Sequence, residues 1–189
     1  MSDSPYRALA LVGMPGAGKT LCAHHLEARG FFQFRFGSII EDEVVRRGWT
    51  VTPDHERIVR EEFRAQDGMD AIARRALPRL HEALQTQRSV VMDGLYSFSE
   101  YRTLRGEFGD SMVVVAIVAP RALRYHRLAT RTVRPLTPEE AEQRDWREIE
   151  VIEKGGPIAI ADYTLLNEGE PDALLKALDN LLARLEIEP

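Results

Sequence analysis

One stretch of this chain, Gly13-Met14-Pro15-Gly16-Ala17-Gly18-Lys19-Thr20, matches the pattern G-x-x-x-x-G-K-[ST] at every fixed position. The apolar run 8–12 before it predicts a short buried strand, and residues 21–29 after it predict a helix. Glycines let backbone N–H groups turn toward an anion, and the start of a helix adds the positive end of its dipole. The stretch therefore predicts a phosphate-binding loop between a strand and a helix, and it constrains the fold more than any other feature.

The pattern also assigns residues to a nucleoside triphosphate and its metal. We expect Lys19 to neutralise the β- and γ-phosphates, and Thr20 to offer its hydroxyl to Mg²⁺. The residues predicted to hold the cofactor ATP here are Gly13, Pro15, Gly16, Ala17, Gly18, Lys19, Thr20 and Cys22. A packed structural thiol is the alternative for Cys22, the single cysteine of the chain. The loop predicts an enzyme or a nucleotide switch.

Length and charge bound the class of protein. At 189 residues the chain predicts one domain, and 44% hydrophobic with 29% charged residues is typical of a soluble protein. No run of 18 apolar residues occurs and the N-terminus lacks a secretory pattern, so we expect a cytoplasmic protein without a membrane partner. The net charge of −5 argues against a nucleic-acid partner. We expect a monomer or a homodimer.

Five apolar segments alternate with helical patterns. Strands are predicted over 8–12, 31–36, 89–93, 112–119 and 163–166. Helices are predicted over 21–29, 39–47, 53–67, 72–86, 98–108, 121–133, 138–154 and 171–185, with a bend at Pro78 and a turn at 155–157. The unbroken apolar run at 112–119 is typical of a central strand buried on both faces. The alternation predicts a three-layer α/β domain of the P-loop NTPase class around a five-stranded parallel sheet.

A carboxylate stands at the end of the third predicted strand. Because ligands bind outside the carboxyl ends of parallel strands, Asp93 is a candidate Mg²⁺ ligand and catalytic group beside the phosphate loop. A turn or cap residue ahead of Gly94 is the alternative. About fifty residues of helix separate the second and third strands, which is too many for one crossover. We therefore predict a small helical subdomain inserted there.

Several short motifs together resemble the nucleoside monophosphate kinases of the adenylate kinase type. They are the phosphate loop, Gly37-Ser38-Ile39-Ile40, Asp93-Gly94, the pair Arg127 and Arg131, and Arg144-Asp145. The loop, the segment 64–75 and Ala161-Asp162-Tyr163 with Asn167-Glu168-Gly169 look more closely like adenylate-kinase-related P-loop proteins common in archaea. That ending is also similar to dephospho-CoA kinases. The resemblance implies a core at 5–36, 89–126 and 148–189, an acceptor-binding insert at 37–88 and a lid at 127–147.

The resemblance also implies roles for particular side chains. Arg127 and Asn167 would lie near the donor base, while Arg131, Arg134 and Arg144 would close over the transferring phosphoryl group beside Lys19 and Asp93. The residues implied to bind the acceptor are Gly37, Ser38, Arg64, Gly68, Gly94 and Tyr96. The alternatives are solvated helix faces for the arginines and ordinary packing for Tyr96. Cationic lid residues suit this reaction, because charge spreads over the phosphoryl oxygens during transfer.

Two positions depart from the adenylate kinase pattern. Ser38 stands where that family has an acidic residue, and 95–97 lacks the arginine that would bind the acceptor phosphate, so Arg64 is the substitute we infer. The sequence predicts an ATP- and Mg²⁺-dependent kinase acting on a nucleotide-like small molecule, with a nucleoside monophosphate as first choice. Transfer to a ribose hydroxyl, as in dephospho-CoA kinases, and a regulatory ATPase are the alternatives. Residues 167–170 do not match the guanine-reading pattern of GTPases.

Overall fold

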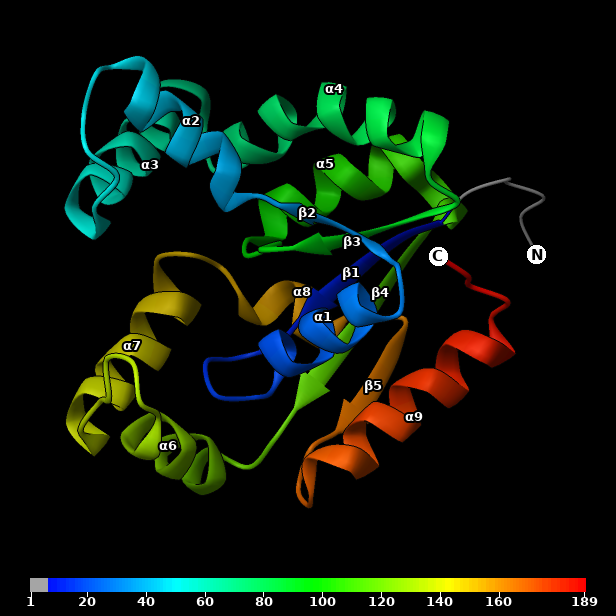
Figure 1. Cartoon of the computed structure of the whole chain (residues 1–189). Coiled ribbons are helices and arrows are strands. Elements are labelled where there is room, and N and C mark those ends of the chain that lie inside the picture. Colours follow the sequence, from blue (N-terminus) through cyan, green and yellow to red (C-terminus); the bar gives the residue numbers. More distant parts are fainter. Residues whose placement is uncertain (1–6) are drawn as a thin grey trace.

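The computed structural model describes residues 7–189, in which five strands form one parallel sheet (Figure 1). The strands are β1 (Arg7–Val12), β2 (Phe32–Arg35), β3 (Ser89–Asp93), β4 (Met112–Val118) and β5 (Tyr163–Leu166). Their order across the sheet is β2-β3-β1-β4-β5, and every neighbouring pair is parallel. The predicted fold class is confirmed. Residues 5 and 6 of the predicted core lie outside the described part.

The helices follow the strands in the predicted alternation. They are α1 (Lys19–Ala28), α2 (Gly37–Arg46), α3 (Pro53–Asp67), α4 (Ala71–Thr86), α5 (Phe98–Phe108), α6 (Arg121–Thr130), α7 (Pro138–Glu150), α8 (Gly155–Ala159) and α9 (Pro171–Arg184), with a 3₁₀ turn at Gly109–Ser111. Reciprocal capping boxes start two of them, Ser97 with Glu100 at α5 and Thr137 with Glu140 at α7. No helix in the described range 7–189 is long and apolar enough to cross a membrane.

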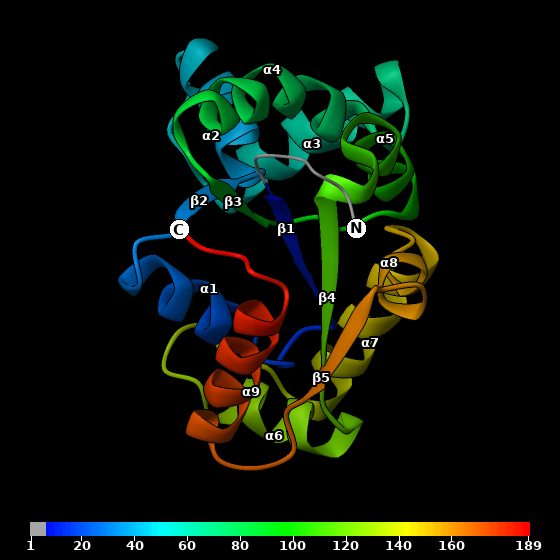
Figure 2. The ribbon, with the colours of Figure 1, turned by 90° about the vertical axis from the view of Figure 1, so that its right-hand side faces the viewer.

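Helices cover both faces of the sheet, which makes three layers (Figures 1 and 2). On one face, α1 and α9 pack against alternate strand residues such as Leu9, Leu11 and Ile117. On the other face, α2, α3, α4 and α5 share a cluster with the intervening strand residues, including Ala10 and Met92. The helices of the predicted insert thus bury side chains in the same hydrophobic cluster as the sheet. The division into core, insert and lid stays a prediction.

Local signals were misleading near the end of α7. The predicted turn at 155–157 is the first part of helix α8, and the helix predicted to run to 154 ends at Glu150. Packing explains this difference, because a Cβ added at Gly156 would lie 2.8 Å from the Phe98 side chain of α5, so the glycine allows close approach. Pro157 is buried in this short helix. In α4, the helix assignment continues across Pro78 from Ala71 to Thr86.

Candidate functional site

The phosphate loop spans residues 13–18 between β1 and α1, as the sequence predicts. Gly13 and Gly18 have φ values of 152° and 112°. A Cβ at Gly13 would lie 2.4 Å from the Ile117 carbonyl oxygen, and one at Gly18 would lie 2.4 Å from Asn167 Nδ2. Both positions therefore require glycine, because positive φ and close approach exclude a side chain. The loop is fixed against β4 and against the segment that follows β5.

Lys19 begins α1 and points back into the loop. Its Nζ donates to the carbonyl oxygens of Gly13 at 2.6 Å and Met14 at 3.3 Å. Burial, with the nearby Lys154 ammonium, lowers the pKa of Lys19 to about 7, since a buried charge loses its hydration. The ammonium thus lies where the sequence predicts a phosphate-binding lysine.

A cavity of about 380 Å³ opens in front of the loop. Its walls come from the loop, α1, α3, the end of β3, α6, α7 and the segment before α8. They are Pro15, Gly16, Lys19, Thr20, Arg60, Arg64, Asp93, Tyr96, Leu128, Arg131, Arg144, Glu148, Ile152 and Lys154. Six of these side chains are cationic and two are carboxylates, so the cavity is suited to a polyanion. Nine of the predicted site residues line it together.

Asp93 and Thr20 meet at this cavity from different elements. In the sheet, Asp93 of β3 lies opposite Leu11 of β1, one residue before β1 ends, so its carboxylate reaches the same edge as the loop. The described residues contain no group of three metal-ligating side chains of the His, Cys, Asp and Glu types. One hydroxyl and one carboxylate nevertheless fit Mg²⁺, which takes one or two protein oxygens and completes its shell with phosphates and water.

Arg64 of α3 is a buried guanidinium in the cavity wall. Its Nη2 lies 3.7 Å from Glu100 Oε1, and neither its Nε nor its Nη2 has a hydrogen-bond partner in the described structure. The other Glu100 oxygen accepts hydrogen bonds from the amides of Tyr96 and Ser97 at 2.9 and 3.0 Å. Burial lowers the pKa of Arg64 and raises that of Glu100. Arg64 therefore places a cation in the cavity wall, beside the buried Glu100 carboxylate.

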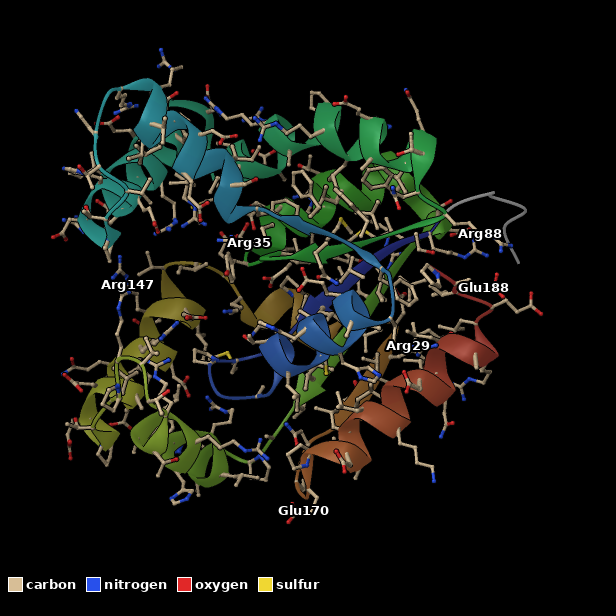
Figure 3. All side chains as sticks on the ribbon, in the orientation of Figure 1. Arg29, Arg35, Arg88, Arg147, Glu170 and Glu188 are labelled. Atoms are coloured by element: carbon tan, nitrogen blue, oxygen red, sulfur yellow. The ribbon has the colours of Figure 1, made fainter. Side chains whose placement is uncertain are left out.

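A second cavity of about 850 Å³ continues the first one outward between α3 and α7. Both are lined by Arg60, Arg64, Arg144, Glu148 and Ile152. The outer cavity adds further charged residues of both signs, among them Arg57, Glu61, Arg134 and Arg147. Arg147 points from α7 toward α3, where its Nη2 lies 3.6 Å from Glu61 Oε1 (Figure 3). The two helices thus face each other across a charged cleft.

Asn167 and Arg127 lie behind the loop and outside the lining of the cavity. Asn167 Nδ2 donates to the Ala17 carbonyl at 2.8 Å, and the Asn167 backbone N–H donates to the Val118 carbonyl at 2.7 Å. Arg127 Nη2 donates to both Asn167 oxygens, at 3.1 and 3.2 Å. These bonds connect the loop, β4 and α6 to the segment after β5. Contact of either residue with a donor base stays a prediction.

Cys22 does not lie at the cavity. Its side chain is fully buried in the cluster that contains Leu9, Leu26 and Leu178, and its amide donates to the Gly18 carbonyl at 3.2 Å. Burial raises the pKa of the thiol to about 12. This packing supports the structural alternative for Cys22, and its assignment to the cofactor stays a prediction.

The glycines and serine predicted for the acceptor also lie outside both cavities. Gly37 and Ser38 begin α2, and Ser38 lines a separate depression with Phe32 and Phe34 of β2. Gly68 ends α3 with a φ of 91°, and Gly94 follows β3 with a φ of 102°. The Gly68 amide donates to the Arg64 carbonyl, and Gly94 directly follows Asp93. None of these four predicted residues belongs to the lining of either cavity. Arg134 lines the outer cavity and does not line the inner one.

Sequence reasoning missed a buried ion pair beneath the loop. The Arg124 guanidinium of α6 donates to both carboxylate oxygens of Asp145 in α7, at 2.9 and 2.5 Å, and to the Pro15 carbonyl at 3.0 Å. It also missed Lys154 and Glu148, which are buried and paired at the cavity. The helical spacing of Arg124 and Arg131 does not indicate that Arg124 is buried and that Arg131 lines the cavity. Only the Arg144-Asp145 dipeptide gave a signal, through the resemblance.

Known proteins share this sequence and architecture. Residues 9–151 match a family described as an AAA domain. The chain is 34% identical over 178 residues to a UPF0200 protein of Thermococcus gammatolerans, with 93% of each chain covered. Its structure is similar to that of TT1252 from Thermus thermophilus, at a TM-score of 0.65, 20% identity and coverage of 96% and 99%. It is also similar to shikimate kinase from Bacteroides thetaiotaomicron, at a TM-score of 0.59, 15% identity and coverage of 94% and 98%. The chain therefore belongs to the UPF0200 proteins, within this AAA-domain family, and has a P-loop kinase-like fold.

Proposed function

We propose that this protein is an ATP- and Mg²⁺-dependent phosphotransferase that moves the γ-phosphoryl group to a nucleotide-like acceptor, with a nucleoside monophosphate as first choice. The observation that carries the proposal is the convergence of the phosphate loop, Asp93 and several cations from α3, α6 and α7 on one cavity. A kinase needs this arrangement, because phosphoryl transfer depends mainly on positioning and on cationic stabilisation of the moving group.

The loop side of the cavity would bind the donor. Lys19 and the loop amides hold the β- and γ-phosphates, with Thr20 and Asp93 on either side as oxygen ligands for the metal. Mg²⁺, when bound, neutralises charge on the phosphate oxygens. In the transfer, the bond from the γ-phosphorus to its bridging oxygen breaks, a bond to an acceptor oxygen forms, and ADP leaves with the electron pair.

The side of the cavity away from the loop would bind the acceptor and the phosphoryl group during its transfer. Its cations are Arg64 of α3, Arg131 at the end of α6 and Arg144 of α7, which line the same cavity. The outer cavity leaves about 850 Å³ for the rest of the acceptor. Closure of α7 on α3 would exclude water, which otherwise competes with the acceptor for the phosphoryl group.

A hydroxyl acceptor, as in the dephospho-CoA kinase reaction, is the second candidate. It is favoured by the Asp93 carboxylate in the cavity, since a hydroxyl gains from a general base and a phosphate acceptor does not. Asp93→Asn separates the two. It should lower turnover at saturating Mg²⁺ far more steeply for a hydroxyl acceptor than for a phosphate acceptor, because only the hydroxyl must lose a proton.

The test is ATP turnover against nucleoside monophosphates, dephospho-CoA and nucleosides. We expect one class to stimulate ADP formation at least tenfold, and Lys19→Ala to lower kcat/KM by more than about 100-fold, as loss of a transition-state cation does. Lys176→Ala, on the exposed face of α9, is the matched control and should keep wild-type rates. ATP consumption that no acceptor stimulates contradicts the kinase and leaves the regulatory ATPase.

A further inference from the structure

Lys154 is a buried lysine that lines the same cavity as Lys19, the lysine of the phosphate loop. The chain has three lysines, and two of them, Lys19 and Lys154, line the same cavity. Lys154 follows α7 and precedes α8, and only 3% of its surface is exposed. A fully buried lysine is rare, because its charge loses hydration and must find partners. The partners of this ammonium are therefore informative about its role.

Its partners in this structure are few. Lys154 Nζ donates to Glu148 Oε2 and lies 4.6 Å from the centre of the Tyr96 ring. The other oxygen of the same carboxylate accepts from Arg144 Nε at 3.2 Å, so one negative charge serves two cations. The backbone closes the unit, since the Lys154 amide donates to the Glu148 carbonyl at 2.9 Å. Glu148 thus holds Lys154 and Arg144 together at the cavity wall.

Cations outnumber carboxylates among the residues that line this cavity, although Asp145, Glu100 and Glu56 lie next to three of those cations from outside the lining. Burial lowers the pKa of Lys154, and the Lys154 charge in turn contributes to the lowered pKa of Lys19. Asp93 and Glu148 are the carboxylates of the cavity lining, against six cations. A structural ion pair placed only for stability would not need to face a second buried lysine. An anion between the two lysines relieves the repulsion.

The location of Lys154 indicates which anion. Tyr96, whose ring Lys154 contacts, is a residue that the proposed function gives to the acceptor. Glu148 lines both the inner cavity and the outer cavity between α3 and α7. Arg64 lines both of these cavities as well. Lys19 already supplies the cation at the donor phosphates. A second buried lysine in the same cavity is thus available to a phosphate on the acceptor.

We infer that Lys154 is a second phosphate-binding lysine, which exchanges Glu148 for the phosphate of the acceptor and so selects a phosphorylated acceptor over its unphosphorylated form. This inference rests on the proposed function and narrows it to acceptors that carry a phosphate. Glu148 has the complementary role of holding the ammonium in position while the cavity is empty of substrate. Arg144 remains bonded to that carboxylate and keeps it in place.

The experiment compares Lys154→Met with Lys154→Arg, and uses Lys176→Met as the matched control because Lys176 is exposed on α9. Calorimetry measures the affinities of AMP, CMP, UMP and GMP beside those of adenosine, cytidine, uridine and guanosine, with Mg·ATP measured separately. We expect Lys154→Met to weaken the best monophosphate at least tenfold, with its nucleoside and Mg·ATP changed less than twofold. Lys154→Arg should recover most of the loss, and Lys176→Met should match the wild type.

The outcomes separate this inference from the proposed function. Equal loss for the monophosphate and for Mg·ATP overturns the inference, because it indicates a structural or donor-side role. The inference is also overturned if the wild-type protein binds no monophosphate better than its nucleoside. This outcome leaves the proposed kinase intact when Mg·ATP binds and another acceptor is turned over. Selective loss of the monophosphate supports the inference even where turnover is absent and the proposed function fails. Circular dichroism verifies the folding of each variant. If Lys154→Met does not fold, the comparison is made with Lys154→Arg, which keeps a cation at this position.

Discussion

At the scale of single residues, the loop conformation depends on groups that never touch the ligand cavity. Arg124 and Asp145 form an ion pair and are only 7% and 5% exposed. The Arg124 guanidinium also donates a hydrogen bond to the Pro15 carbonyl. The sequence gave no means to identify this pair, because 21 residues separate its members and 109 separate Arg124 from Pro15. Which arginine of α6 is buried depends on how α6 docks on α7 and on the loop.

We expect Arg124→Met to lower the free energy of unfolding by about 3–5 kcal/mol, because it leaves the Asp145 carboxylate buried without its partner. Adding Asp145→Leu should recover much of that loss, since the orphaned charge is then removed. Urea unfolding followed by circular dichroism gives both values. Arg121→Met is the control, because its pair with Glu142 spans 3.5 Å at the surface and should contribute less than about 1 kcal/mol. Similar losses for both arginines contradict this account.

At the scale of elements, the segment after β5 acts as a brace for the phosphate loop. Asn167 bonds the Ala17 carbonyl, and Arg127 of α6 bonds Asn167 in turn. Sequence patterns identified each element and missed this connection, because 150 residues separate Asn167 from Ala17. The short helix α8 was missed for a related reason. Gly155-Gly156-Pro157 is a turn by local propensity, and its packing on α5 overrides that propensity.

Removing the brace should weaken both the fold and the nucleotide site. Asn167→Ala leaves the Ala17 carbonyl without its buried donor and removes one of the two hydrogen bonds of Arg127 Nη2, which costs about 1–3 kcal/mol of unfolding free energy. Mg·ATP affinity should fall several-fold as the loop loses its fixed position. Asn180→Ala, at an exposed position of α9, is the matched control for denaturant unfolding and calorimetry. An unchanged Mg·ATP affinity in folded Asn167→Ala would show that the brace does not shape the site.

At the scale of the whole molecule, the site lies where the sheet, α3 and α7 face one another. The cations of the inner cavity come from positions 19, 60, 64, 131, 144 and 154, so only the complete fold assembles them. The lining of this cavity carries six cations and two carboxylates, so we expect a bound polyanion to relieve the repulsion among the cations. Binding of Mg·ATP should therefore stabilise the entire chain as well as the loop.

We expect Mg·ATP at 100 times its Kd to raise the melting temperature by roughly 5–11 °C, from about 2.7 kcal/mol of binding linkage and about 2–4 °C per kcal/mol at this chain length. Differential scanning calorimetry measures the shift. Lys19→Ala should abolish most of it at the same ligand concentration, because the central cation of the loop is gone. A wild-type shift that survives in Lys19→Ala would place the nucleotide elsewhere.

The sequence alone determined the phosphate loop, the three-layer α/β class with its parallel sheet, the helix starts at Thr52, Ser97 and Thr137, and the presence of Asp93 at the edge beside the loop. These features follow from local rules, namely side-chain periodicity, capping chemistry and the backbone freedom of glycine. Only the tertiary structure decided that Arg64 and Lys154 line the cavity, that Arg124 and Asn167 support it from behind, and that Cys22 lies in the core. The reason is that these roles depend on strand order and helix docking, which bring together residues that no local pattern connects.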